Sequence, residues 1–420
     1  SGRGAYPIKF NGSLFTVDSR EPAEVFDADY RRWGGAYWFQ NTRLAYWPML
    51  MAGDDDCLKP LFDMYWNLLP MALERTRIWY GHGGAFFPET LTFWGTYRFR
   101  DYGYVRNDAP AGEVLNKYIG RYWDGGLELL AMHIDAHAFR PSDTFWTGRV
   151  LPLARAVLAF FEEHYPIRDG YGHLHVAPSQ ACETWQKATN PTPVIAGLRW
   201  CLEQLLSDAA PGIPDEDRAR WSAFLAIVPP VPTRCIPHTR RGTILPAAEY
   251  DELANCENPE LYAVFPYRLF GLFRPGIDTA HAAYEMRLFR KSGGWQQDAI
   301  QSALLGLGDE AARCVKENFL ECHGGSRFPA FWGPNYDWIP DMDHGSVACV
   351  ALQRMLVQYD GDALLLLPAW PKAWNADFRL HAPRNTIVEG RVENGNIVRL
   401  AVTPPEREKD VRIHGAPQSV

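Results

Sequence analysis

Amphipathic helical periodicity runs through most of the first 375 residues, and it limits the possible folds more than any other feature of the sequence. In the clearest segment, apolar residues recur at three- and four-residue steps, the period of one helix face, at Trp146, Val150, Leu153, Val157 and Phe161. Similar patterns predict helices over ten segments: 42–52, 57–77, 112–138, 143–164, 191–208, 215–227, 278–290, 295–305, 308–320 and 344–358. No β-rich segment is predicted among them, so we expect a mainly α-helical chain.

The pattern changes after Trp374, where short β-rich runs replace the helical period. The dipeptide Asn394-Gly395 separates the last two runs and predicts a tight hairpin. We therefore expect a lead-in segment at 1–33, a helical domain at 34–374 and an antiparallel β segment at 375–420. An even number of helices with long loops favours an α/α toroid, although periodicity alone does not separate a toroid from other helical packings.

Composition excludes several classes of protein. The net charge of −8 argues against a nucleic-acid partner, and no apolar run is long enough to span a membrane. Rossmann, P-loop and nucleophile-elbow motifs are absent from the sequence, and its eight cysteines form no C-x-x-C pair. His173 and His175 have the spacing of metal ligands, but no third ligand is evident and a surface hairpin is favoured. We therefore predict no metal and no cofactor.

Two polar loops precede predicted helices, and in both of them capping competes with a functional role. Asn41 stands just before a helix, where an N-cap is favoured over an amide that binds a substrate hydroxyl or orients a water. Asp343 is also a natural N-cap. Asp341, Asp343 and His344 together could contact a metal, but one short motif does not complete a coordination shell.

Two further loops contain glutamates close to apolar residues. Glu183 follows small and apolar residues and is close to Trp185; such surroundings raise a carboxyl pKa, as a general acid requires. An exposed loop glutamate is an equally good interpretation. Glu257 and Glu260 lead into an abruptly apolar segment, where they could line a pocket or cap a helix.

Four segments, in this order, resemble glycoside hydrolase family 95, the α-L-fucosidase and α-L-galactosidase type, in a divergent bacterial branch. The resemblance covers about residues 30–395. The early N-x-N-T-x-x-N-Y-W run of the family is similar to FQNTRLAYW, its P-S-x-S-P-E-N to PSQACET, its I-D-G-N-F-G to MDH, and its L-L-P-A-L-P-x-x-W to LLPAWPKAW; these segments occupy 39–47, 178–184, 342–344 and 366–374. The last of them fixes the alignment of Asp343 without a gap.

Other positions depart from the family pattern. Phe39 replaces the first asparagine of the early run, and Glu89 and Trp94 lie where the family has G-W-x-x-H-H-N-T-D-x-W-G. Glu257 and Glu260 stand where the family has histidines. Because these family residues handle the sugar and the water, we expect weak or absent activity on aryl α-L-fucosides.

The resemblance implies an (α/α)6 barrel and an inverting exo-glycosidase that acts on plant, algal or host glycans. Glu183 is then the general acid and Asp343 the general base, with Asn41 orienting the attacking water. An inverting mechanism predicts that the two carboxyl groups lie roughly 6.5–9.5 Å apart. It also implies a periplasmic or secreted bacterial protein. The chain begins at Ser1 without a signal peptide, and we expect it to be a processed or truncated product.

The residues expected around the sugar come from separate loops: Trp38, Phe39, Glu89, Trp94, Trp185, Glu257, Glu260, Trp295, Trp332, Asp341 and His344. The partner is an oligosaccharide or polysaccharide. Two alternatives stay open: a polysaccharide lyase or α-L-rhamnosidase-like enzyme with an (α/α) barrel, and a glycan-binding protein without catalysis.

Overall fold

The computed structural model describes residues 6–10, 33, 35–208, 210–320 and 342–414. The chain divides into two compact units, each of which is described by itself. The Glu183 unit comprises Leu61–His137 and Ser142–Phe289; the Asp343 unit comprises Ser1–Pro60, Ala138–Pro141 and Arg290–Val420. Closure of the helices into an (α/α)6 barrel, and the boundaries 1–33, 34–374 and 375–420, stay predictions. None of the described helices is long and apolar enough to cross a membrane.

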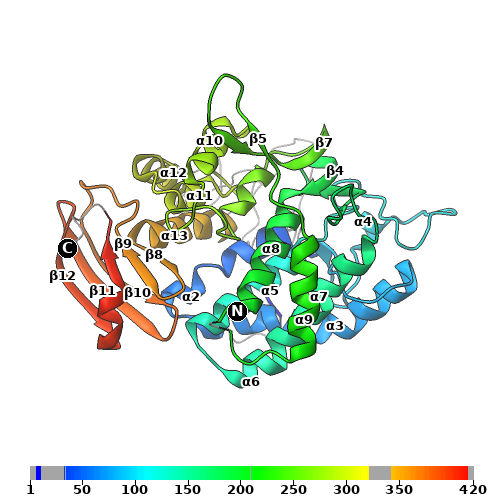
Figure 1. Ribbon diagram of the computed structural model, residues 1–420, viewed down its shortest axis with the longest axis horizontal. Coiled ribbons are helices and arrows are strands. Elements are labelled where there is room, and N and C mark those ends of the chain that lie inside the picture. Colours follow the sequence, from blue (N-terminus) through cyan, green and yellow to red (C-terminus); the bar gives the residue numbers. More distant parts are fainter. Residues whose placement is uncertain (1–5, 11–32, 34, 209, 321–341, 415–420) are drawn as a thin grey trace, which may run out of the picture. The chain divides into compact units, whose positions relative to one another are not determined.

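Long helices form most of the Glu183 unit, labelled in Figure 1. The helical period of 143–164 is confirmed, because Leu153, Val157 and Phe161 are all buried. Ser142 caps this segment by accepting a hydrogen bond from the backbone of the third following residue. The helices are α3 Lys59–Tyr80, α4 Phe99–Tyr102, α5 Gly125–Phe139, α6 Asp143–Phe145, α7 Leu151–His164, α8 Thr192–Leu206, α9 Asp215–Ile227 and α10 Ile277–Met286. A π-helix, Trp146–Val150, joins α6 to α7.

The predicted helix at 112–138 begins only at Gly125. Turns occupy 112–124, where Gly112 and Gly120 interrupt the sequence and weaken helix formation. The predicted start of α8 was also misplaced. Pro191 ends a strand, and the Asn190 side chain accepts a hydrogen bond from the Val176 amide.

Antiparallel strands in the Glu183 unit contradict the expectation of no β structure before residue 375. A three-stranded sheet has the order β3–β4–β7, and β5 and β6 form a separate pair; the strands are β3 Ser179–Ala181, β4 Trp185–Pro191, β5 Thr233–Cys235, β6 Gly242–Ile244 and β7 Ala247–Leu253. The core of the three-stranded sheet consists of Ala181, Ala188 and Ala247, with Trp185 and Tyr250 packed against it. Alanines give little alternation of apolar and polar residues, so the sequence pattern did not predict these strands.

The Asp343 unit contains three longer helices that contact one another, α11 Asp298–Leu304, α12 Gly308–Leu320 and α13 Met342–Leu356 (Figure 1). Its early segment, predicted as one helix over 42–52, is divided into short turns of helix, because Pro48 lacks a backbone donor for a continuous helix. The helical turns are α1 Phe39–Thr42, the 3₁₀ turn Arg43–Ala45 and α2 Met49–Ala52, and a short strand, β1 Tyr37–Trp38, precedes them.

Two sheets complete the Asp343 unit. Antiparallel β10 Ala376–Ala382, β11 Thr386–Glu393 and β12 Asn396–Thr403 form the predicted C-terminal sheet. Asn394 and Gly395, with φ of +51° and +77°, form the predicted two-residue hairpin turn, which requires left-handed backbone at both positions. A second sheet has the order β13–β9–β8, from Val411–Ile413, Ala363–Leu366 and Val357–Asp360, so β structure begins before residue 375 here as well.

Candidate active site

Glu183 lies in the turn between β3 and β4. Only 7% of the residue is exposed, so the interpretation of an exposed loop glutamate is wrong. Cys182, just before it, has a left-handed backbone with φ of +50°, which costs a non-glycine residue roughly 1–2 kcal/mol. Strained residues of this kind cluster at functional sites and persist only where the surroundings hold them.

Gln180 holds this turn in place. Its Nε2 donates to the carbonyl oxygens of Tyr118, at 2.6 Å, and Cys182, at 2.8 Å. Its Oε1 accepts from the Arg121 backbone amide at 2.7 Å. Three hydrogen bonds from one buried amide therefore fix the backbone on which Glu183 is mounted.

Asn255 is the hydrogen-bond donor to Glu183, with 2.6 Å between Asn255 Nδ2 and Glu183 Oε2. Asn255 Oδ1 accepts from the Cys256 amide at 2.8 Å, which orients the side-chain amide. The Ala254 backbone donates to the Thr184 carbonyl at 2.8 Å and ties this segment to the turn. Because a donor occupies one carboxyl oxygen, a proton on Glu183 would be carried by the other oxygen.

A buried acidic cluster surrounds the Cys182 thiol. Burial raises the thiol pKa well above its usual range, and the charges of Glu257 and Asp124 raise it further. Burial also raises the pKa of Tyr122, with the neighbouring thiol as the next cause. The Tyr262 hydroxyl donates to Glu257 Oε1 at 2.6 Å. A thiol held neutral in this way is a poor nucleophile, so Cys182 supports the fold of the turn.

A cavity of about 260 Å³ opens beside this cluster. Trp185 and Tyr250 line it, with their ring centroids 4.8 Å apart in an edge-to-face arrangement. Glu257 and Glu260 also line it, whereas Glu183 is not among the lining residues. The volume lies slightly below the range of drug-sized pockets and suits a small ligand such as one sugar ring.

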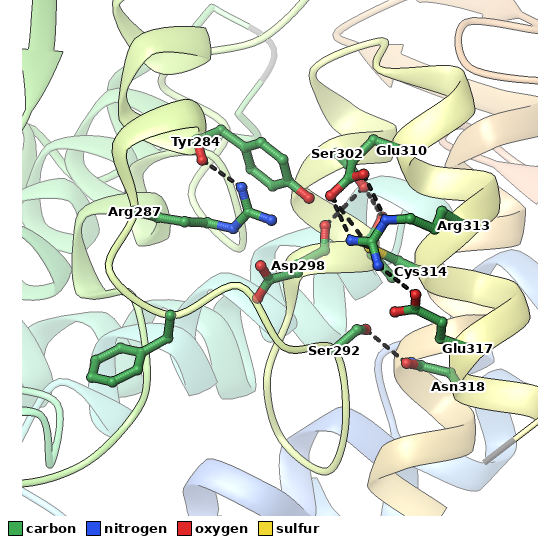
Figure 2. Close-up of polar contacts among 12 residues, drawn as sticks. Tyr284, Arg287, Ser292, Asp298, Ser302, Glu310, Arg313, Cys314, Glu317 and Asn318 are labelled. Carbon is green, nitrogen blue, oxygen red and sulfur yellow. Dashed lines mark hydrogen bonds and ion pairs between the residues drawn. The ribbon is translucent and has the colours of Figure 1, made fainter.

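Asn258 lines the same cavity, but its side chain has a structural task. Its Nδ2 donates to the Phe289 carbonyl at 2.8 Å, and its Oδ1 accepts from the Phe289 amide at 3.1 Å. Nearby, Arg287 donates to the Tyr284 carbonyl and lies over the Tyr284 ring (Figure 2). These contacts fix the end of α10, which contributes Met286 to the cavity.

Asn41 and Asp343 form the corresponding pair in the Asp343 unit. Asn41 Nδ2 donates to Asp343 Oδ2 at 2.6 Å, and the two residues are only 2% and 1% exposed. The expectation that Asn41 is an N-cap is wrong, because it lies inside α1, whose N-cap position is Trp38. Asp343 is the second residue of α13 rather than its cap, and its Oδ1 accepts from the His344 amide at 2.8 Å.

Asp343 therefore sits in the first turn of a 15-residue helix. Backbone N–H groups at a helix start have no carbonyl partner within the helix and, with the helix dipole, favour a negatively charged side chain. This environment favours an ionised Asp343.

His344 supports the start of α13. Its Nδ1 accepts from the Gly294 amide at 2.9 Å, so Nε2 carries the proton that is donated to the Asn318 carbonyl at 2.6 Å. The Asn318 side chain in turn accepts from Ser292 Oγ at 2.7 Å (Figure 2). Both ring nitrogens are thus engaged within the protein, which suits a positioning role for His344.

The other predicted substrate-binding residues are dispersed. Trp94 is 57% exposed and its ring packs on Phe93, whereas Glu89 is buried in the same unit. Trp38, Phe39 and Trp295 are buried in the Asp343 unit, and the Trp38 indole donates to the Trp33 carbonyl. Trp332 and Asp341 lie outside the described residues.

Two supporting residues were missed from the sequence. Gln180 and Asn255 make the hydrogen bonds that hold Glu183 and its turn, but no local pattern marks either of them. Asn255 stands 72 residues beyond Glu183, and only the pairing of β4 with β7 brings it there. Within the described part of the chain, no group of three or more His, Cys, Asp or Glu side chains could hold a metal ion.

Comparison with solved structures identifies the fold. The chain matches a structure described as "Putative kojibiose phosphorylase from human microbiome" with a TM-score of 0.57 and 12% sequence identity. The match covers 88% of this chain and 54% of the other, so this chain spans about half the length of that protein. A wild-type glycosidase matches at 14% identity over 76% of this chain and 88% of its own, with a TM-score of 0.45.

At 12% identity, the first match shows that the two chains share a fold and no more. No protein-family model matches the sequence, and no curated protein matches it. Membership of glycoside hydrolase family 95 therefore stays a prediction from the sequence motifs.

Proposed function

We propose that this protein is a carbohydrate-active enzyme, an inverting exo-acting glycoside hydrolase that removes sugars from plant, algal or host glycans. The observation that carries the proposal is the hydrogen bond between Asn41 and Asp343. These residues are 302 positions apart. The family motifs independently assign Asp343 as the general base and Asn41 as the residue that orients its water.

Glu183 suits the role of general acid. It is buried in a turn of constrained backbone, and one of its oxygens already accepts a hydrogen bond from Asn255. The second oxygen can then hold the proton that is donated to the glycosidic oxygen. Burial of a carboxyl group favours its neutral form, which a general acid needs before the reaction.

Asp343 is the more deeply buried of the two carboxyl groups, but the helix start and the hydrogen bonds that it accepts from Asn41 and from the His344 amide favour its charged form, which suits the role of general base. Asn41 has a second N–H and a carbonyl oxygen beyond the bond to Asp343, and these can orient a water molecule. In the proposed reaction the water oxygen bonds to the anomeric carbon and its proton passes to Asp343. The bond to the leaving oxygen breaks, and that oxygen takes the proton of Glu183.

Phosphorolysis is the second candidate, because a protein with the same fold is described as a "Putative kojibiose phosphorylase". A phosphorylase places phosphate where a hydrolase places water. An ionised Asp343 would repel a phosphate anion, whereas it activates a water molecule. The Asp343 environment therefore favours hydrolysis.

The deciding experiment follows aryl glycosides and oligosaccharides by proton NMR, with and without inorganic phosphate. We expect a free sugar whose first-formed anomer is inverted, at a rate that phosphate does not change. A sugar phosphate product would replace the proposal by phosphorolysis, and an unsaturated uronide with ultraviolet absorbance would replace it by a lyase. Saturable glycan binding with no turnover over the whole panel would leave a binding protein. Glu249→Gln changes an exposed glutamate of the same sheet and is the matched control for Glu183→Gln.

A further inference from the structure

A second cavity, of about 550 Å³, lies in the Glu183 unit. Its lining includes Gln180, which holds the Glu183 turn, but none of the residues that act as acid, base or water-orienting group in the proposed reaction. Strand β4 contributes to both cavities: Trp185 lines the smaller one, and Gln186 and Lys187 line the larger one. The larger volume falls in the usual range of small-molecule sites.

The lining residues of the larger cavity sort by charge and burial. The buried ones, Val114, Trp123, Gln180 and Gln186, are neutral, whereas all the charged ones are exposed: Glu113, Lys117, Arg121, Lys187 and Glu252. Lys187 and Glu252 also form an ion pair with each other. A ligand that reached the floor of this cavity would therefore meet aromatic and amide groups without a fixed charge.

Gln186 has an unsatisfied donor. The residue is 7% exposed, and its Nε2 has no hydrogen-bond partner among the described residues. A buried amide N–H without a partner costs about 1–3 kcal/mol, so native proteins rarely retain one without a reason. A ligand oxygen on this side of β4 would satisfy it.

His164 supplies an acceptor in the same cavity. His82 Nδ1 lies 2.7 Å from the Gly83 carbonyl and so carries a proton, which leaves its Nε2 to accept from His164 Nδ1 at 2.8 Å. Burial, and then the neighbouring His82, lower the pKa of His164 to about 4. The His164 ring is therefore neutral at pH 7, with Nε2 as an acceptor.

We propose that this cavity is a second carbohydrate site, which binds a neutral sugar unit apart from the site of hydrolysis. A sugar has an apolar ring face that packs on Trp123, a hydroxyl oxygen that accepts from Gln186 and a hydroxyl proton that His164 accepts. The neutral floor selects against a ligand that carries its charge inward. The site requires no catalysis, so it stands or falls independently of the proposed reaction.

The test is ¹⁹F NMR of protein labelled with 5-fluorotryptophan, with the signals of Trp123 and Trp185 assigned from Trp123→Phe and Trp185→Phe. Glucose, galactose, cellobiose and maltose are the neutral probes, and galacturonate is the anionic one. We expect saturable movement of the Trp123 signal with a neutral probe. Gln186→Leu should weaken that binding about tenfold, which corresponds to one lost hydrogen bond of about 1.4 kcal/mol.

Trp185→Leu, at the adjacent position of the same strand, is the matched control and should leave the Trp123 titration unchanged. The proposal is overturned if no neutral probe moves the Trp123 signal, or if Gln186→Leu binds as tightly as the unaltered chain. Movement with galacturonate alone would also overturn it, in favour of an anion site governed by the exposed cations. Loss of the Trp123 titration in Trp185→Leu would assign the sugar to the smaller cavity instead.

Discussion

Glu183 and Asp343 are both buried carboxylates that accept a 2.6 Å hydrogen bond from an asparagine, yet the backbone presents them in different ways. Glu183 stands in a hairpin turn beside a left-handed residue, held by Gln180 and by the pairing of β4 with β7. Asp343 stands in the first turn of a helix, where its Oδ1 accepts a hydrogen bond from the His344 amide.

The difference shows how one carboxyl–amide pair can be adapted to two tasks. A helix start stabilises negative charge, whereas a strand turn supplies no aligned dipole of that kind. Pairs of carboxyl groups whose surroundings favour opposite protonation states are typical of acid and base partners in catalysis. The comparison therefore favours Glu183 as acid and Asp343 as base.

The largest expected effect separates the two carboxylates by leaving group. Glu183→Gln should lower kcat roughly 10³-fold for natural oligosaccharides, but much less for activated aryl glycosides, whose leaving group needs no proton. Asp343→Asn should depress both classes, because water activation is needed in each. Steady-state kinetics on matched substrates measure this, and equal losses in both variants for both classes would contradict the division of roles.

Acid sensitivity should distinguish the two units next. Burial lowers the pKa of His133 and of His164 to about 4, and both residues belong to the Glu183 unit. The unfolded chain takes up these protons near pH 6.5, so their stabilisation is complete above pH 6.5 and is lost as the pH falls towards 4. For the fully buried His133 the loss is about 3 kcal/mol.

Hydrogen exchange at pH 7 and pH 5, resolved by segment, checks this expectation. Exchange should rise first in α5 and α7 of the Glu183 unit. His133→Phe, which can stack between Phe62 and Phe145 as the imidazole does, should reduce the difference in free energy of unfolding between the two pH values. The exposed His238→Gln is the control and should leave it unchanged. An unaltered pH dependence in His133→Phe would exclude His133 as the cause.

Asn41 provides a third and smaller test. Asn41→Ala removes the bond to Asp343 and the groups that would orient water, so kcat should fall about 10- to 100-fold, as expected for a hydrogen bond to a charged group. Thr42→Val is the matched control, because it removes a buried hydrogen bond of the same helix, to the Phe10 carbonyl. It should lower stability without a comparable change in kcat. Similar kcat losses in both variants would make the role of Asn41 merely structural.

The sequence predicted those features that local chemistry determines. The helix over 143–164 and the Asn394-Gly395 hairpin follow from apolar period and turn residues, and both are confirmed. The sheet that carries Glu183 could not be predicted, because its core is made of alanines and its pairing is long-range.

The candidate site shows the same limit. Motif order predicted roles for Glu183, Asn41 and Asp343, and these roles stay predictions. Local reasoning made Asn41 a helix cap, whereas it bonds to Asp343 across 302 positions. Asn255 and Gln186 have no local signal, since Asn255 reaches Glu183 through the pairing of β4 with β7, and Gln186 lines a cavity built from segments far apart in the sequence. The separation of the Glu183 and Asp343 carboxyl groups stays a prediction.

The smallest expected effect tests the backbone strain that distinguishes the Glu183 turn from the helix start at Asp343. Cys182→Gly and Cys182→Ala both remove the thiol, but glycine accepts the φ of +50° without a steric cost. The glycine variant should therefore be more stable than the alanine variant by about 1 kcal/mol in urea unfolding. Ala181→Gly, one residue earlier in the extended strand, should instead lose about 1 kcal/mol, because glycine weakens a strand. If the alanine variant at position 182 proves the more stable, the turn stores no strain at Cys182, and Glu183 owes its position to Gln180 and Asn255 alone.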